Sequence, residues 1–333
     1  MRARYGYTAV FGRASSGGRC DDHDREHGTG FGVALIAKSR LTGKVVRALP
    51  SPSASGSSRR AGPPSPARGT PTTACTSGCS GRYVTVLLIG TSGWQYKDWR
   101  PGLYPAGLPQ RLWLERYASR FAVVEINNAF YRLPERDTFR QWRDRTPDDF
   151  VFAVKMSRYL THVKRLKDPA EPVARFLGRA EALGGKLGPV LLQLPPNLRA
   201  DVAALDETLA QFPRSVRVAV EPRHETWFTG EVRDLLKRHG AALCWADRLG
   251  RPRTPLWRTA EFGYVRMHEG RAHPWPRYGR TSLSSWLDRI GSDLSGVPVY
   301  VFFNNDPGGA AVIDAAAMAA LARRRGWDVA RTP

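Results

Sequence analysis

The sequence has little cysteine and no long apolar run, and these two absences exclude whole classes of protein. Four cysteines occur in 333 residues, too few for a disulfide scaffold of this length. Only Cys244 lies in an apolar, core-like segment, so we expect a reducing compartment, the cytoplasm. No stretch approaches the roughly 18 consecutive apolar residues of a membrane helix, so no membrane protein is predicted.

Several catalytic signatures are missing as well. The sequence has no nucleophile elbow, no redox cysteine pair and no Rossmann fingerprint. These absences argue against a serine hydrolase, a thioredoxin-like protein and a nicotinamide-dependent enzyme. There is also no His-x-His or His-Glu-x-x-His pair, so a divalent metal is an open alternative without a spacing motif behind it.

Acidic residues are scarce, and none occurs between Glu26 and Asp98. The formal net charge is +21, and arginine outnumbers lysine 43 to 8. Residues 1–83 carry 13 basic and 4 acidic side chains, or +9, which leaves +12 for residues 84–333. Two explanations of this excess compete: codon bias together with a solvated basic surface, or selection for a polyanionic partner. Either explanation favours an anionic ligand over a cationic one.

The first 83 residues differ in amino-acid composition from the rest of the chain. Residues 50–81 consist only of Pro, Ser, Ala, Gly, Arg, Thr and Cys, a composition with too little apolar surface to offset the entropy of ordering. We therefore expect a disordered extension over residues 1–83. It could be a targeting peptide, a basic tail, or upstream DNA read in frame with translation starting near Val84 or Val86; we favour the last.

From Val86 onward, short apolar runs alternate with longer stretches of helical period. Eight strands are predicted at residues 86–90, 123–126, 150–154, 190–194, 216–220, 241–246, 264–267 and 299–303. Helices are predicted between them at residues 110–120, 138–145, 171–183, 202–212, 231–239, 284–294 and 310–324. This alternation predicts one α/β domain over residues 84–333, a (β/α)8 TIM barrel, with a doubly wound open sheet as the alternative.

Polar residues stand at the carboxyl end of every predicted strand. In chain order they are Ser92, Glu125 with Asn127, Lys155, Gln193, Glu221, Asp247, Arg266 with His268, and Asn304 with Asn305. Each one alone is explained as a turn residue. Because all eight carboxyl ends of a TIM barrel surround one mouth that holds the active site, the series together predicts a functional site.

The titratable side chains of this series suggest acid–base chemistry. Glu221 is the candidate base, with His268 as proton donor and with Glu125 and Asp247 as further carboxylates. The structural alternative is that Glu221 forms a bracing ion pair with Arg223 or Arg266. Lys155 suggests an anion contact or, if desolvated, a Schiff-base amine.

The remaining candidates would bind a ligand. Lys155 and Arg266 would hold the anion, and Glu125 with Asn127 and Asn305 would orient the substrate. The other polar candidates for ligand contact are His162, Gln193, Arg223 and Asn304. Aromatic faces stack on bases or sugar rings, and Trp94, Tyr131 and Trp227 adjoin the polar strand ends.

The motifs at these strand ends resemble the domain-of-unknown-function 72 family of YecE-like proteins. The resemblance covers residues 86–325 and implies a TIM-barrel fold without an established activity. It is carried by Ile89-Gly90-Thr91-Ser92-Gly93-Trp94, Val124-Glu125-Ile126-Asn127 with Phe130-Tyr131, Phe152-Ala153-Val154-Lys155, Thr161-His162, Gln193-Leu194-Pro195-Pro196, Glu221-Pro222-Arg223-His224 with Trp227, Ala246-Asp247 and Phe303-Asn304-Asn305. Pro222 stands where the family usually has an aromatic residue.

Two functions are consistent with these observations. The first is a hydrolase or lyase that acts on a small anionic, phosphate-bearing sugar or nucleotide in the barrel mouth. The second is a non-catalytic nucleic-acid-binding protein whose affinity would fall steeply with salt. The basic residues form no single long run, which favours an enclosed site for a small ligand.

Overall fold

The computed structural model describes residues 86–333, all within one compact unit of the chain, Thr76–Pro333. The extension expected over residues 1–83 lies outside the described residues. Within residues 86–333, no helix is both long and apolar enough to cross a bilayer.

The fold is mixed α/β, built on one curled sheet whose strands run in the order β6-β5-β4-β3-β2-β1-β10-β9-β7-β8, with β11 beside β1. Its strands are β1 (Val86–Ser92), β2 (Val123–Ile126), β3 (Val151–Lys155), β4 (Leu187–Gln193), β5 (Val218–Glu221), β6 (Ala242–Leu243), β7 (Trp245–Arg248), β8 (Arg251–Pro252), β9 (Gly263–Met267), β10 (Val299–Phe303) and β11 (Asp328–Val329). Only β7 and β8 pair antiparallel among the described strands. Seven of the eight predicted strands are confirmed apart from shifts of a few residues at their ends; the strand predicted at 241–246 is divided into β6 and β7, and β8 and β11 were not predicted.

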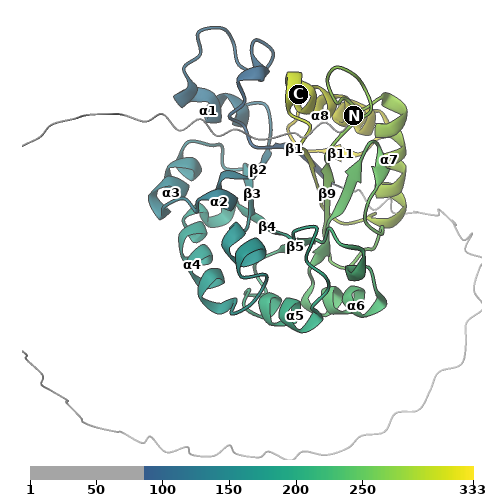
Figure 1. Cartoon of the computed structure of the whole chain (residues 1–333). Coiled ribbons are helices and arrows are strands. Elements are labelled where there is room, and N and C mark those ends of the chain that lie inside the picture. The colour runs from purple at the N-terminus through teal and green to yellow at the C-terminus, as the bar shows by residue number, and fades with distance from the viewer. Residues whose placement is uncertain (1–85) are drawn as a thin grey trace, which may run out of the picture. The chain divides into compact units, whose positions relative to one another are not determined.

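Helices lie outside the curled sheet (Figure 1). Their bounds are α1 (Trp113–Ala118), α2 (Asn128–Tyr131), α3 (Arg136–Asp144), α4 (Ala170–Ala180), α5 (Val202–Ala210), α6 (Gly230–His239), α7 (Arg280–Asp293) and α8 (Ala310–Arg324). Local chemistry sets their ends. The Thr229 hydroxyl accepts the Val232 N–H at the start of α6, and Gly240 ends that helix at φ 62°, a left-handed conformation that favours glycine.

The strand–helix alternation is incomplete at one place. Among the described residues, no helix connects β7 to β9; the chain turns back as β8 and then runs irregularly to β9. Gly250, Pro252 and Pro255 lie in this connection, and proline removes a helical hydrogen bond and clashes with the preceding turn. The expectation of a strict (β/α)8 repeat is corrected here.

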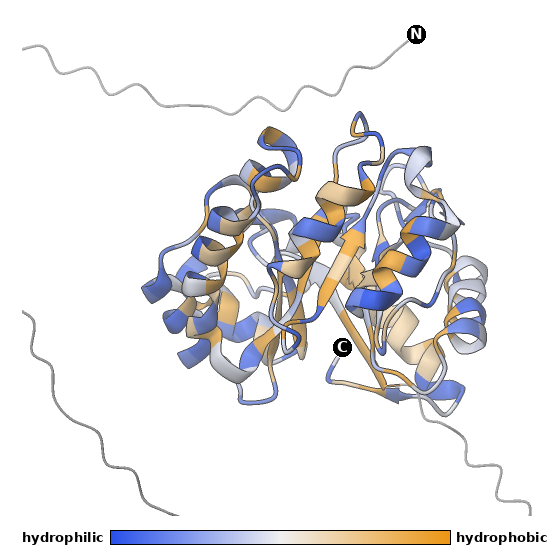
Figure 2. Cartoon of the chain, turned by 90° about the horizontal axis from the view of Figure 1, so that it is seen from below, coloured by the Kyte–Doolittle hydropathy of each residue, from blue (hydrophilic) through white to orange (hydrophobic). Residues whose placement is uncertain are grey.

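Alternate residues of each strand face two different cores. One core lies between the strands and the helices and includes Leu192 and Val265. The other fills the inside of the curl with apolar side chains such as Leu191, Ala219 and Tyr264. Figure 2 shows the matching pattern, with hydrophobic strands inside and hydrophilic residues on the outer helices.

The inner face changes character toward the carboxyl ends of the strands. Polar residues follow the inner apolar ones at a spacing of two, so they point to the same side. The pairs are Val123 and Glu125, Ala153 and Lys155, Leu191 and Gln193, Ala219 and Glu221, and Tyr264 and Arg266. These five polar residues form a polar tier at the carboxyl end of the sheet, directly above the apolar side chains. This is the end at which the sequence predicts the functional site.

Candidate functional site

The centre of the polar tier is the guanidinium group of Arg266, which joins two carboxylates from distant strands. Its Nε and Nη2 donate to the two oxygens of Glu125 at 3.0 and 2.8 Å, and its Nη1 donates to Oε2 of Glu221 at 2.7 Å. All three side chains are at most 1% exposed. The bracing ion pair considered as the structural alternative is therefore present.

Glu125 is saturated with hydrogen-bond donors. Besides Arg266, its Oε1 accepts the Ser92 hydroxyl at 2.8 Å and its Oε2 accepts the Tyr264 hydroxyl at 2.7 Å. Burial alone would raise the pKa of this carboxyl, but the charge of Arg266 and these hydrogen bonds outweigh it and lower the pKa. Glu125 is ionised and fixed in position.

Glu221 has four donors of its own. Its Oε2 also accepts from Gln193 Nε2 at 2.8 Å, and its Oε1 accepts from Arg223 Nε at 3.0 Å and from His268 Nε2 at 3.2 Å. Burial raises its pKa, yet the charge of Arg266, the hydrogen bond from His268 and the charge of Arg223 hold the pKa well below the usual range. A carboxylate with so low a pKa and no free oxygen is a poor general base.

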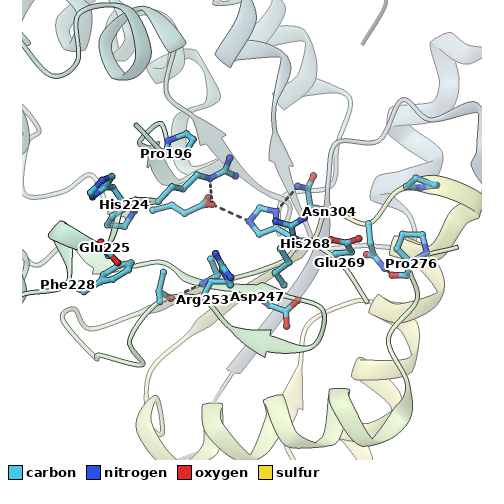
Figure 3. Close-up of a pocket in the computed structure, with 18 residues that line it drawn as sticks. Pro196, His224, Glu225, Phe228, Asp247, Arg253, His268, Glu269, Pro276 and Asn304 are labelled. Carbon is cyan, nitrogen blue, oxygen red and sulfur yellow. Dashed lines mark hydrogen bonds and ion pairs between the residues drawn. The ribbon is translucent and has the colours of Figure 1, made fainter. Parts of the chain in front are cut away.

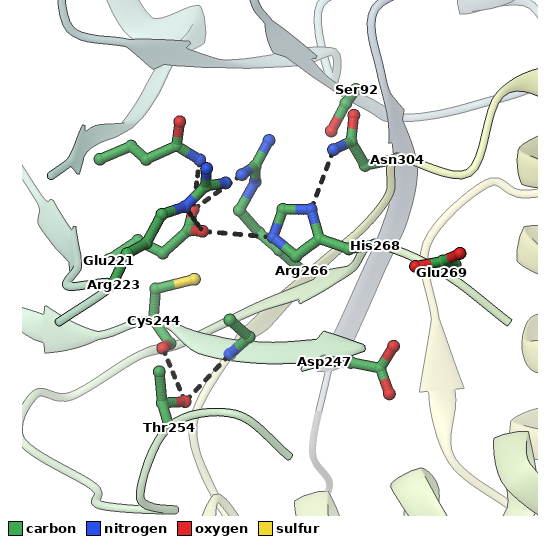
Figure 4. Close-up of polar contacts among 12 residues, drawn as sticks. Ser92, Glu221, Arg223, Cys244, Asp247, Thr254, Arg266, His268, Glu269 and Asn304 are labelled. Carbon is green, nitrogen blue, oxygen red and sulfur yellow. Dashed lines mark hydrogen bonds and ion pairs between the residues drawn. The ribbon is translucent and has the colours of Figure 1, made fainter. Parts of the chain in front are cut away.

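His268 lies between Glu221 and Asn304 (Figure 4). Because an ionised carboxylate can only accept, Nε2 carries the ring proton, and Nδ1 accepts from Asn304 Nδ2 at 3.0 Å. Burial and the charge of Arg266 lower the pKa of His268 although Glu221 opposes them, so the ring is neutral. Both ring nitrogens are engaged, which makes His268 a positioning group in this arrangement.

Lys155 differs from its neighbours because its amine has no polar partner. The side chain is 9% exposed, and among the described residues its Nζ makes no hydrogen bond or ion pair. Nζ lies 3.9 Å from the ring centroid of Phe130. Burial, reinforced by the charge of Arg266, lowers the pKa of Lys155 to about 7. A large share of this amine is therefore unprotonated at neutral pH.

The rim beside Lys155 is formed by the segments that follow β2 and β3. Residues Tyr159–Val163 form a π-helical turn that carries His162, and the His162 ring meets Phe130 edge-on at 4.9 Å between centroids. Burial and the charge of Lys155 lower the pKa of His162 to about 4, so it is neutral. Tyr131 is 74% exposed on the same rim.

A pocket of about 860 Å³ opens at the carboxyl ends of β5, β7, β9 and β10 (Figure 3). Its wall includes Glu221, Arg223, Asp247, Arg253, His268 and Asn304. Among the described residues, the Arg253 guanidinium has no hydrogen-bond or ion-pair partner, and Arg223 uses only its Nε. Two arginines therefore present uncommitted donors to a pocket large enough for a small ligand.

Asp247 belongs to the wall of this pocket, but its carboxylate points away from Glu221 and His268 (Figure 4). It accepts the Tyr278 hydroxyl and, at 3.2 Å, the Trp286 indole N–H. Burial raises its pKa to about 6 although these hydrogen bonds oppose the shift. The structure therefore separates Asp247 from the other carboxylates with which the sequence grouped it.

Three residues expected to bind a ligand are buried and have packing or hydrogen-bond partners inside the protein. Trp227 is fully buried and its indole N–H donates to the Leu198 carbonyl at 2.8 Å. Trp94 is 4% exposed and meets Trp142 edge-on at 5.3 Å between centroids. Asn305 is 1% exposed, and its amide donates to Asp314 and to a backbone carbonyl. Asn127 follows β2 as expected, with a buried Oδ1 that lacks a hydrogen-bond partner.

The side chains of the tier do not form a metal-ligand set. Within residues 86–333, no three His, Cys, Asp or Glu side chains are grouped so that they could hold a metal ion. Arg266 occupies the place between Glu125 and Glu221 that a bridging cation would take.

Two residues of the site were missed in the sequence. Tyr264 donates to Glu125. It lies two residues before Arg266 on the same strand, and this spacing could have shown that both side chains face the same side of the sheet. Arg253 lies on the pocket wall, directly after β8. The sequence offers no signal for this position beyond the excess of arginine around it.

A curled parallel sheet with helices outside and a polar pocket at the strand carboxyl ends defines a TIM-barrel-like α/β protein. The chain belongs to the DUF72 family, because the family described as "Protein of unknown function DUF72" matches residues 88–333. This confirms the resemblance seen in the sequence.

Individual relatives agree with this assignment. The UPF0759 protein YecE of Escherichia coli (strain K12) is 32% identical over 46% of this chain; the match spans about half of the relative, 54% of its length. The UPF0759 protein YunF of Bacillus subtilis (strain 168) is 25% identical over 67% of this chain and 90% of YunF. The crystal structure of a DUF72 family protein from Thermotoga maritima matches 72% of this chain and 99% of its own, with a TM-score of 0.62 and 28% identity.

Proposed function

We propose that the protein is a hydrolase or lyase that acts on a small anionic substrate, a phosphate-bearing sugar or nucleotide, bound in the pocket of about 860 Å³. The observation that carries the proposal is the pair of arginines with uncommitted donors, Arg253 and Arg223, on the wall of that pocket. Guanidinium groups match phosphate oxygens in charge and geometry.

The residues of the polar tier take different parts in this proposal. Arg266, Glu125 and Glu221 hold the tier rigid, since each is buried and makes at least three hydrogen bonds within it. Asn304, which His268 holds in place through its Nδ1, orients the substrate at the pocket wall. The role of base passes from Glu221 to Lys155, whose amine is unpaired and whose pKa of about 7 suits proton transfer at neutral pH.

The alternative, a nucleic-acid-binding protein, has less support. It depends on aromatic faces that stack on bases, and Trp94 and Trp227 are buried, which leaves Tyr131 as the exposed member of that set. A small ligand in the pocket needs none of the three. We also expect the protein to act in the cytoplasm, where the buried thiol of Cys244 stays reduced.

Binding of ribose 5-phosphate, compared with ribose, tests the proposal. Titration calorimetry should show binding that depends on the phosphate, and Arg253→Met should weaken it about tenfold or more, the usual effect of losing a charge-assisted hydrogen bond. Arg233→Met, on the outer face of α6 where Arg233 pairs with Asp234, serves as the matched control and should bind as wild type does. Equal affinity of the Arg253 and Arg233 variants would refute the phosphate site.

We further propose that the sheet closes into an eight-stranded barrel, with β6 and β7 acting as one strand. Only Cys244 separates them; β6 pairs with β5, and β7 pairs with β9. The Cys244 N–H donates to the Val220 carbonyl at 2.8 Å, which extends the pairing with β5 by one residue. Closure in this way would place all eight carboxyl ends around one mouth.

A further inference from the structure

We infer that Lys155 is a nucleophile that forms an imine with the carbonyl carbon of its substrate, while Arg223 holds the anionic group of the same molecule. This inference rests on the proposed function and narrows the substrate class to anionic aldehydes and ketones. Three observations support the inference: the surroundings of the amine, its reactivity and exposure, and the cation nearby.

The surroundings of Lys155 leave its amine free to react. The carboxylates that act on it through their charge, Glu125 and Glu221, already have both oxygens taken by other donors. A lysine that only balanced these charges would pair with one of them. Instead Nζ lies 3.9 Å above the centre of the Phe130 ring, an apolar surface that keeps water away from one side.

The amine also meets the electronic requirement for attack on a carbonyl. A lysine becomes nucleophilic when it is desolvated or placed beside another cation, and Lys155 has both conditions, through its burial and through Arg266. Nζ itself is not among the fully shielded side-chain atoms that lack a partner, so part of its surface stays exposed, although Lys155 is not one of the residues that line the pocket of about 860 Å³.

Arg223 places an anion-binding group within range of this amine. Lys155 and Glu221 stand in the polar tier on β3 and β5, which both pair with β4. Arg223 Nε donates to Glu221 Oε1 at 3.0 Å, so its guanidinium lies at the same part of the mouth as Lys155, and its charge lowers the pKa of Lys155. Among the described residues its Nη1 and Nη2 have no hydrogen-bond partner, and Arg223 is one of the residues that line the pocket. A substrate with a carbonyl and a phosphate a few atoms apart could contact Lys155 and Arg223 together.

The covalent step is balanced without any further reagent. The neutral amine nitrogen bonds to the carbonyl carbon, and one of its two protons passes to the carbonyl oxygen, which gives a carbinolamine. The second N–H proton then leaves with that hydroxyl as water while the C=N bond forms, so one amine and one carbonyl give one imine and one water. Hydrolysis reverses the step and restores the free lysine.

Trapping the imine with two matched aldehydes tests the inference. The full chain is incubated at neutral pH with pyridoxal 5′-phosphate or with pyridoxal, reduced with borohydride and digested, and each of the eight lysines is quantified by mass spectrometry. We expect Lys155 to react first, about tenfold faster with the phosphorylated aldehyde, because a charge-assisted contact of this kind is typically worth such a factor. Arg223→Met should remove that preference.

Lys164 is the internal control, because it lies in the segment after β3 but forms an ion pair with Asp168. Lys164→Met should leave the trapping at Lys155 unchanged. If Lys155 reacts no faster than Lys164 while ribose 5-phosphate still binds, the imine is refuted and the proposed function stands. If ribose 5-phosphate does not bind and Lys155 is not trapped, both proposals fail.

Discussion

Replacing Arg266 by methionine should bring the protein close to unfolding. The substitution removes the cation between Glu125 and Glu221 and leaves two ionised carboxylates buried at the centre of the tier. Breaking one buried ion pair costs about 3–5 kcal/mol, and here one guanidinium serves two carboxylates. Since domains are stable by only about 5–15 kcal/mol, most of the free energy of unfolding would be lost. Urea unfolding followed by tryptophan fluorescence measures it.

A compensated variant separates lost charge balance from lost packing. In the triple variant Glu125→Gln, Glu221→Gln and Arg266→Met, no buried charge is left unpaired among these three positions, so stability should largely recover. Arg233→Met, which removes an exposed arginine on α6, should leave stability nearly unchanged. If Arg266→Met unfolds at the same urea concentration as wild type, the guanidinium does not brace the tier.

Replacing Lys155 by methionine should instead stabilise the protein at neutral pH. Burial and the charges of Arg266 and Arg223 disfavour the protonated amine, and Glu125 and Glu221 offset this only in part. Methionine fills a similar volume without a charge. A functional group that destabilises its own fold is a common feature of active sites. Because burial lowers the pKa from 10.5 to about 7 and a tenfold change in proton affinity is worth about 1.36 kcal/mol, the gain at pH 7 should be about 4 kcal/mol.

The effect should depend on pH with a definite sign. Above the ordinary lysine pKa of 10.5 the amine is neutral in both states, and wild type and variant should differ little in charge energy. As the pH falls from 10.5 to 7, the unfolded chain binds a proton that the folded protein does not, so wild-type stability falls relative to the variant. Below pH 7 both states are protonated and the difference stays constant.

Unfolding of the two proteins between pH 6 and pH 10 gives this difference directly, because the other titrating groups contribute alike to both. Lys164→Met is the matched control and should show no such trend, since Lys164 is ion-paired with Asp168 at the rim. A constant difference over that range would mean that Lys155 has an ordinary pKa, and the base proposed here would be lost with it.

The fold could be predicted in large part from the sequence, because periodicity is a local property. Buried strands appear as short apolar runs, and the polar residue at each strand end was visible in the order of the chain. The connection from β7 to β9 was the place where the regular repeat failed, and its prolines lie in the sequence itself.

The organisation of the site could be predicted only in part, because it depends on contacts between residues far apart in the chain. Glu125 and Arg266 are 141 residues apart, and nothing local shows that one saturates the other. The same limit explains Trp227: its position after a strand end suggested an exposed ring, but its N–H is taken by Leu198, which lies 29 residues earlier. Lys155 could be identified because it stands at the carboxyl end of a predicted strand, which is a local property of the sequence.

The two tiers of the inner face also have a consequence for redesign. The apolar tier holds side chains such as Leu191 and Ala219, and each functional position stands two residues further along its strand. Side chains of the polar tier can therefore be replaced while the apolar packing below them stays unchanged. Libraries restricted to the upper positions, with the charges of Arg266, Glu125 and Glu221 varied as one unit, would explore new activities at low risk to folding.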